Sequence, residues 1–192
     1  GLLSGGVHAN SAPVLDNSGT MTLTGINEDN YTSAGNTIAA LIATGSGDHI
    51  TDVDAAAIEG IAVIAVDNSN GAWQYNTGSG WTNFGTPTAS AARLLGADTA
   101  NNKVRFVPTG NFTGSVDPGI TFRAWDKTTG SNGSTADISG GGARGGTTAY
   151  STATETAAIA VAAAPLACRT EPGLGPCTEH FLRNRPLRLA EA

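Results

Sequence analysis

The sequence predicts an all-β fold, an antiparallel Greek-key β-sandwich, from its composition and from the spacing of short strand-like segments. The chain has 192 residues, of which 26 are glycine and only 14% are charged. Thr, Ser, Gly, Ala and Val are abundant and runs of Lys or Glu are absent, which is poor material for surface helices. Strand-like segments are separated by turn residues at a spacing of roughly ten residues, which is typical of a sandwich.

The predicted strands are bounded by Gly, Asn, Asp or Pro. Thr77-Gly78-Ser79 predicts the loop of a β-hairpin, because glycine lies between two alternating apolar segments. Residues 38–44 are compatible with a buried strand or a short helical turn, and residues 90–97 with a short helix or a strand. The remaining strands are expected at residues 21–24, 60–66, 72–76, 80–84, 103–108, 120–126 and 156–162.

One segment interrupts this pattern. Residues 127–148 are rich in glycine and contain almost nothing apolar except Ile138. A segment with so little apolar material is expected to form a long exposed loop or a hairpin excursion.

The composition divides the chain into three parts, a linker at residues 1–11, a sandwich at residues 12–164 and an irregular tail at residues 165–192. The tail holds both cysteines of the chain, Cys168 and Cys177. These are expected to form a disulfide or to stay as two thiols, because two cysteines and one nearby histidine are too few ligands for tetrahedral zinc.

The body of the chain is acidic. The formal net charge of the chain is −6 at neutral pH, and four of its ten basic residues lie in the tail. An acidic body disfavours nucleic acid and anionic membrane surfaces as partners, and no apolar run is long enough to span a bilayer. An acidic, Thr- and Gly-rich body without cysteine is typical of secreted bacterial proteins, so we expect an extracellular or cell-surface location.

Catalysis finds no support in the motifs. The sequence contains no nucleophile elbow, zinc-protease helix motif, phosphate loop or dinucleotide-binding glycine motif. His8, His49 and His180 fall in the linker, a turn and the tail, and His49 is interpreted as a surface histidine. Glu59 and Asp67 are likewise expected at turns in water. The chain is therefore predicted not to be an enzyme.

Asp52-Val53-Asp54 is the most informative short motif. In an extended segment, side chains at i and i+2 point to the same side, so the two carboxylates would converge and repel each other. Calcium takes oxygen ligands at about 2.3–2.6 Å and would relieve that repulsion. The alternative interpretation is a solvated acidic turn.

A succession of motifs resembles the cadherin-like, VCBS-type or Ig-like tandem repeats of very large bacterial surface and secreted proteins, over about residues 12–162. The motifs that carry the resemblance are Ser11-Ala12-Pro13-Val14-Leu15-Asp16, Asn27-Glu28-Asp29, Ile50-Thr51-Asp52-Val53-Asp54, Gly71-Ala72-Trp73-Gln74-Tyr75, Val104-Arg105-Phe106-Val107-Pro108 and Phe122-Arg123-Ala124-Trp125-Asp126.

The resemblance implies a structural or adhesive module whose partners are neighbouring repeats or copies of itself, cell-surface glycans or proteins, with calcium at the junctions between repeats. It implies that the calcium ligands come from Glu28, Asp29, Asp52, Asp54 and Asp126. Asn10 and Pro13 resemble remnants of the linker between repeats. Where cadherins place acidic ligands in that linker, this chain has His8-Ala9-Asn10 before Pro13, so a junction on this side would be short of ligands.

Two alternatives remain at the level of sequence. Trp73, Trp81 and Trp125 could form a stacking platform of a carbohydrate-binding module, with Trp81 the best candidate for exposure, because the other two lie in strand patterns where core packing is expected. The chain could also be a subunit of an extracellular filament in which a neighbour donates a strand to an open sheet edge.

Overall fold

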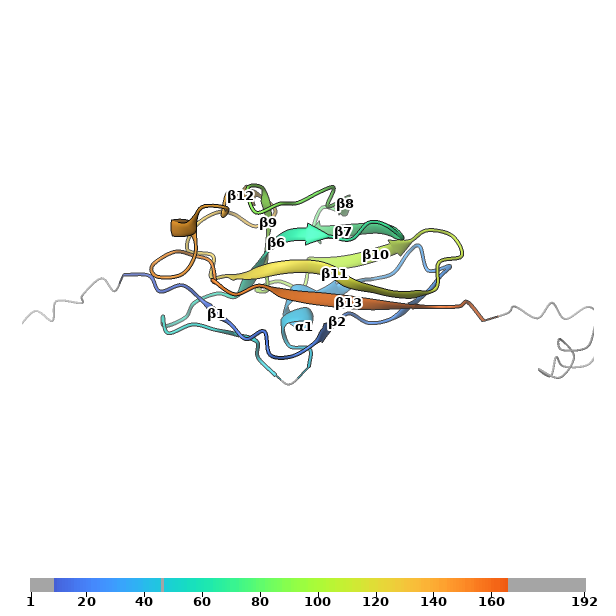
Figure 1. The fold of residues 1–192 in the computed structure, drawn as a ribbon, viewed down its shortest axis with the longest axis horizontal. Coiled ribbons are helices and arrows are strands. Elements are labelled where there is room, and N and C mark those ends of the chain that lie inside the picture. The colour runs from blue at the N-terminus through green and yellow to red at the C-terminus, as the bar shows by residue number, and fades with distance from the viewer. Residues whose placement is uncertain (1–8, 46, 166–192) are drawn as a thin grey trace, which may run out of the picture.

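Two β-sheets face each other across one hydrophobic core in the computed structural model (Figure 1). The structure describes residues 9–45 and 47–165. The larger sheet has the order β12-β9-β6-β11-β13-β2, and β3 also pairs with β13. Its strands are β2 (Met21–Thr22), β3 (Ile26–Asn27), β6 (Gly60–Val66), β9 (Ala92–Gly96), β11 (Gly114–Trp125), β12 (Thr135–Ala136) and β13 (Glu155–Ala162).

The smaller sheet has the order β4-β10-β7-β8. The predicted hairpin is confirmed, because β7 and β8 are antiparallel neighbours joined through Gly78. A separate antiparallel pair is formed by β1 (Val14–Leu15) and β5 (Ile50–Thr51). The strands of the smaller sheet are β4 (Asn36–Thr37), β7 (Gly71–Thr77), β8 (Trp81–Asn83) and β10 (Asn102–Pro108). The all-β class with mainly antiparallel pairing is confirmed, and only β2 and β3 pair in parallel, with β13, among the described strands. The Greek-key connectivity stays a prediction.

Both segments with an ambiguous pattern are resolved. Residues 92–96 are the strand β9, which pairs with β6. The first part of residues 38–44 is a short helix, α1 (Ile38–Ile42), which begins at Thr37 because the Thr37 hydroxyl accepts a hydrogen bond from the Ala40 amide. Ile38, Leu41 and Ile42 of this helix are buried in the main core.

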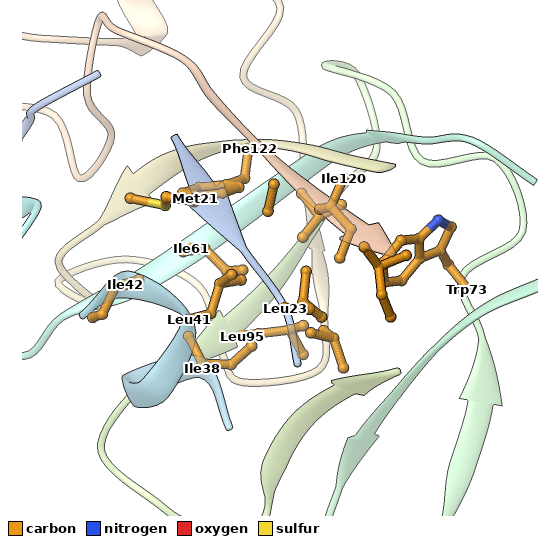
Figure 2. Packing of buried hydrophobic residues seen from close by; sticks show 14 of the residues in the cluster. Met21, Leu23, Ile38, Leu41, Ile42, Ile61, Trp73, Leu95, Ile120 and Phe122 are labelled. Carbon is orange, nitrogen blue, oxygen red and sulfur yellow. The ribbon is translucent and has the colours of Figure 1, made fainter. Parts of the chain in front are cut away.

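The core lies between the sheets and follows the alternation of the strands. In β10, Val104 and Phe106 point inward and are fully buried, whereas the alternate residues Lys103 and Arg105 are only half-buried. The Trp73 and Phe106 rings lie 5.1 Å apart between centroids. Figure 2 shows Leu41 of α1 in this core together with Met21, Leu23 and Ile61.

The first strands and the last strand run parallel. Met21 of β2 lies opposite Ala157 of β13, and Ile26 of β3 lies opposite Val161. Because both segments run the same way along one edge, the chain approaches the sandwich at one end and leaves it at the other (Figure 1). We call the end near residues 9–13 the N-terminal end and the end near residues 162–165 the C-terminal end.

The glycine-rich segment is an excursion with one buried side chain: most of residues 127–148 are exposed, but its short strand β12 pairs with β9 and Ile138 is buried. Residues 126–150 fold back over the outer face of the larger sheet and bury Ile138, Ala149 and Tyr150 there. They cover Leu94 of β9 and Trp125 of β11, which form a second hydrophobic cluster with Ala62. The segment itself has few apolar residues, but the sheet supplies the rest of the apolar surface.

A glycine makes that close approach possible. Gly130 has a φ of +82°, and a Cβ there would lie 2.4 Å from Cδ1 of Leu94. The neighbouring Thr129 carbonyl accepts a hydrogen bond of 2.7 Å from the indole nitrogen of Trp125. A side chain at residue 130 would therefore displace the Leu94 side chain and strain the backbone at its positive φ.

His49 is buried, which corrects its interpretation as a surface residue. Only 2% of it is exposed, and both ring nitrogens face carbonyl oxygens, Nδ1 at 3.1 Å from Asp16 and Nε2 at 2.6 Å from Thr44. The ring lies between the Asp16 and Thr44 carbonyls and so connects the loops on either side of the β1–β5 pair.

The Ile138→Ala variant tests whether the glycine-rich segment is part of the fold. We expect it to lower the free energy of unfolding by about 2–5 kcal/mol, because it leaves a cavity between the segment and the larger sheet. Chemical denaturation would measure this difference. Ile58→Ala is the matched control, because Ile58 is 44% exposed; equal, small losses for both variants would show that the segment does not pack on the sheet.

Candidate functional site

Two consecutive residues of the approaching chain contact two of the predicted acidic ligands at the N-terminal end. The Asn10 side-chain amide donates a hydrogen bond of 2.9 Å to Oδ2 of Asp126, and the Ser11 backbone amide donates one of 2.6 Å to Oδ2 of Asp54. Asp54 and Asp126 therefore lie at the same end of the sandwich, each against one of two consecutive residues, although 72 positions separate them in the sequence.

Asp126 follows directly after β11 and is 4% exposed. Its Oδ1 accepts hydrogen bonds from the backbone amide and the hydroxyl of Thr128, at 2.8 Å and 2.6 Å. The neighbouring Lys127 does not compensate its charge but pairs with Asp98 at 2.7 Å, and this is the one ion pair within the described residues. Asp126 is thus a buried carboxylate held by neutral donors.

Asp52 and Asp54 do not lie in an extended segment as expected. Strand β5 ends at Thr51, and a turn follows in which Oδ1 of Asp52 accepts a hydrogen bond of 2.9 Å from the Asp54 amide. Oδ2 of Asp52 is buried and has no hydrogen-bond partner among the described residues. Val53 between them is 85% exposed. The turn uses one oxygen of Asp52 and leaves the other without a donor.

A cavity of about 710 Å³ lies beside these groups. It is lined by residues 9–11 of the approaching chain, by Val53, Asp54 and Ala55 of the turn, and by Thr128. Three separate segments therefore meet around carboxylate, hydroxyl and carbonyl oxygens, which are the donors that a hard cation prefers.

Glu28 and Asp29 lie at the opposite, C-terminal end. The Glu28 backbone amide donates to the Ala162 carbonyl at 2.9 Å, and Oε1 of Glu28 accepts from the Ala164 amide at 3.1 Å. Asp29 is exposed. Glu28 thus fixes the direction in which the chain leaves, and the five predicted ligands are divided between two ends.

Neither end makes a complete metal site from this chain. Among the residues that the structure describes, no group of three or more His, Cys, Asp or Glu side chains is placed to hold one ion. The donor chemistry fits calcium, and the buried Oδ2 of Asp52, which accepts no hydrogen bond among the described residues, is an oxygen of the kind that calcium takes as a ligand. Asn10 lies in the segment where the resemblance to cadherins would place an acidic linker ligand, but its amide nitrogen donates to Asp126. Each end fits only a part of a calcium site.

Two residues that bond the acidic groups at the N-terminal end, Thr128 and Ser11, were not predicted from the sequence as part of the site. Thr128 was detectable, because Asp followed two residues later by Thr is a common pattern for a side chain that bonds the backbone ahead of it. The Ser11 contribution comes from its backbone amide, which no sequence pattern reveals. At the start of β13, the buried Glu155 was also missed, and its Oε2 has no partner in the described part of the chain.

The three tryptophans do not form a stacking platform. Trp73 and Trp125 are fully buried on opposite sides of the larger sheet, Trp73 in the main core and Trp125 under the glycine-rich segment. Trp81 alone is half-buried, and the Arg105 guanidinium lies 4.3 Å from its ring centroid. A flat surface of several indoles, as the carbohydrate alternative requires, is absent.

Comparison with known proteins does not identify the chain. No family model, no curated protein and no solved structure matches it. In the described part of the chain, no helix is long and apolar enough to cross a membrane.

Glu59 differs from its expected place at a turn in water. It is half-buried beside a cavity of about 550 Å³ that Ile42, Ile58 and Asp48 also line. Burial, and to a smaller extent the charge of Asp48, raises the pKa of Glu59 above its ordinary value. Asp67 does lie at a turn, where hydrogen bonds from Ser69 lower its pKa.

The pKa shifts of Glu59 and Asp67 have opposite signs, so we expect the two groups to change the free energy of unfolding in opposite directions at neutral pH. A raised pKa in the folded state means that the folded state binds the Glu59 proton more tightly, so the charge of Glu59 destabilises the fold at neutral pH. We expect Glu59→Gln to be more stable than the wild type at pH 7, and the difference to vanish as the pH falls through the carboxyl range to about 4. Chemical denaturation across this pH range would measure the difference.

Asp67→Asn is the matched control. Its lowered pKa contributes stability above the ordinary carboxyl value, and this contribution is lost as the pH falls through the lower folded value. The Asn variant should therefore be less stable than the wild type at pH 7. If Glu59→Gln and Asp67→Asn changed the stability in the same direction at pH 7, the opposite pKa shifts of the two groups would be wrong.

Proposed function

We propose that this chain is a non-enzymatic structural or adhesive repeat of a bacterial extracellular protein, joined end to end to similar repeats and stiffened by calcium at the junctions. One observation carries the proposal. The predicted acidic ligands are divided between the two ends of a sandwich through which the chain runs from one end to the other.

The division has a simple consequence for two such sandwiches in a row. The C-terminal end of the first, with Glu28 and Asp29, would face the N-terminal end of the second, with Asp52, Asp54 and Asp126. Carboxylates that are too few at either end would then add up at the junction, where calcium takes six to eight oxygens. Without the ion, the same carboxylates would repel and the junction would loosen.

The details of each end agree with this arrangement. Glu28 is already hydrogen-bonded to the departing chain at Ala164, so its position follows the direction of that chain. Asn10 and Ser11 hold the approaching chain against Asp126 and Asp54. The connection to a neighbour therefore runs directly past the acidic groups at both ends.

Several features support a cadherin-like rather than an enzymatic role. The sandwich has the all-β architecture that the resemblance implies. His49 is buried with both ring nitrogens against carbonyl oxygens. The cavity at the N-terminal end presents carboxylate and backbone groups but no histidine or cysteine among its described lining.

Thermal unfolding with calcium and with chelator tests the proposal. We expect calcium to raise the midpoint of a tandem of two copies of residues 9–165 more than that of one copy, because only the tandem contains a junction. A ligand that binds only the folded state adds about 2.7 kcal/mol at a hundredfold excess over its Kd. Calorimetry at millimolar calcium would measure both proteins.

Variants identify the ligands. Asp52→Asn with Asp54→Asn in the second copy should abolish the calcium shift of the tandem, whereas Asp137→Asn, at an exposed carboxylate that bonds only Ser139, should leave it intact. A tandem whose midpoint does not respond to calcium would refute the junction.

A further inference from the structure

The outer face of the smaller sheet carries basic and amide side chains. The register places Lys103 opposite Asn76, Arg105 opposite Gln74, Gln74 opposite Asn83 and Asn76 opposite Trp81, so these side chains share one side of the sheet. The alternate residues Trp73, Val104 and Phe106 point into the core. We call this surface the amide face, defined by Gln74, Asn76, Trp81, Asn83, Lys103 and Arg105.

The Trp81 indole lies across the amide face. It starts from the edge strand β8, and its Cη2 comes so close to Gly35, next to β4, that a Cβ there would lie 2.7 Å away. The Arg105 guanidinium stacks on the ring at 4.3 Å. An arginine stacked on an indole is held in one orientation and loses little freedom when it binds a ligand.

Arg105 forms no ion pair with an acidic side chain among the described residues. Its Nε donates to Oε1 of Gln74 at 2.7 Å and its Nη1 to the Ser33 carbonyl at 3.1 Å, both neutral groups, while Nη2 donates no hydrogen bond within the described residues. Partial burial lowers the pKa of Arg105, although a guanidinium stays charged. Neither Arg105 nor Lys103 forms an ion pair in the described part of the chain, although the protein has a net charge of −6.

The amide face contains two cations and no carboxylate. Two unpaired cations beside each other create a locally positive potential on the surface of a protein whose net charge is negative. Around them, Gln74, Asn76 and Asn83 present side-chain amides, which donate and accept hydrogen bonds. Nε2 of Gln74 donates a hydrogen bond of 2.8 Å to Oδ1 of Asn83, which holds both side chains in place.

We propose that the amide face binds an acidic polysaccharide through its uronic acid carboxylates. A planar carboxylate matches the remaining guanidinium N–H groups of Arg105 and the Lys103 ammonium, and sugar hydroxyls match the amides of Gln74 and Asn83. An open sheet face suits an extended polymer better than a small molecule, since it gives one sugar few contacts but a chain of sugars many. This binding is independent of calcium at the junctions.

Affinity electrophoresis of the full chain in gels with polygalacturonate, run in chelator, tests the proposal. We expect retardation by polygalacturonate and none by neutral dextran, and a retardation that falls as salt is added. Arg105→Gln should weaken the affinity by about tenfold, since it removes a charge-assisted hydrogen bond. Lys103→Gln, which removes a charge whose side chain makes no hydrogen bond within the described residues, should weaken it in the same direction without disturbing the fold.

Arg93→Gln is the matched control. Arg93 also lies over an aromatic ring, at 5.0 Å from the Tyr75 centroid, but it extends from β9 and bonds the Gly133 carbonyl. Its variant should bind polygalacturonate like the wild type. No retardation of the wild type, equal losses in Arg93→Gln and Arg105→Gln, or preferential binding of dextran sulfate would each overturn the proposal of a uronic acid ligand.

Discussion

The parallel pairing of the first strands with the last strand is the constraint on which the rest of the structure depends. Because β2 and β3 run beside β13 in the same direction, the approaching and departing chain segments lie at opposite ends of the sandwich. That pairing decides that Asp54 and Asp126 meet residues 10 and 11, while Glu28 meets Ala164.

The larger sheet is covered by the main core on one face and, around Ala62, Leu94 and Trp125, by a second hydrophobic cluster on the other. Residues 126–150 cover this second cluster with few apolar side chains of their own. Trp125 links this cover to the N-terminal end, since it precedes Asp126 and donates to Thr129. The buried carboxylate is therefore positioned by a strand on one side and by the glycine-rich cover on the other.

The sequence was sufficient for the strands and the hairpin, since alternation of apolar residues and turn residues is a local signal. It failed where a contact is not local. Nothing around Ile138 indicates that Leu94 and Trp125 leave an apolar surface for it, and nothing around His49 indicates that Asp16 and Thr44 supply carbonyls. The predicted ligands were named from motifs, but their division between two ends follows from the parallel pairing, and the turn at Asp52 follows from the end of β5. The amide face depends on the register of three strands, which no single segment of the sequence contains.

The central claim is that two copies join end to end through ligands contributed by both. Small-angle X-ray scattering of a tandem of two copies, with calcium and with chelator, tests it most directly. The account predicts a rigid, extended particle with calcium, whose longest dimension approaches that of two sandwiches placed end to end, and a broader, more compact distribution in chelator. Identical scattering in both conditions, or two sandwiches packed side by side with calcium, would contradict it.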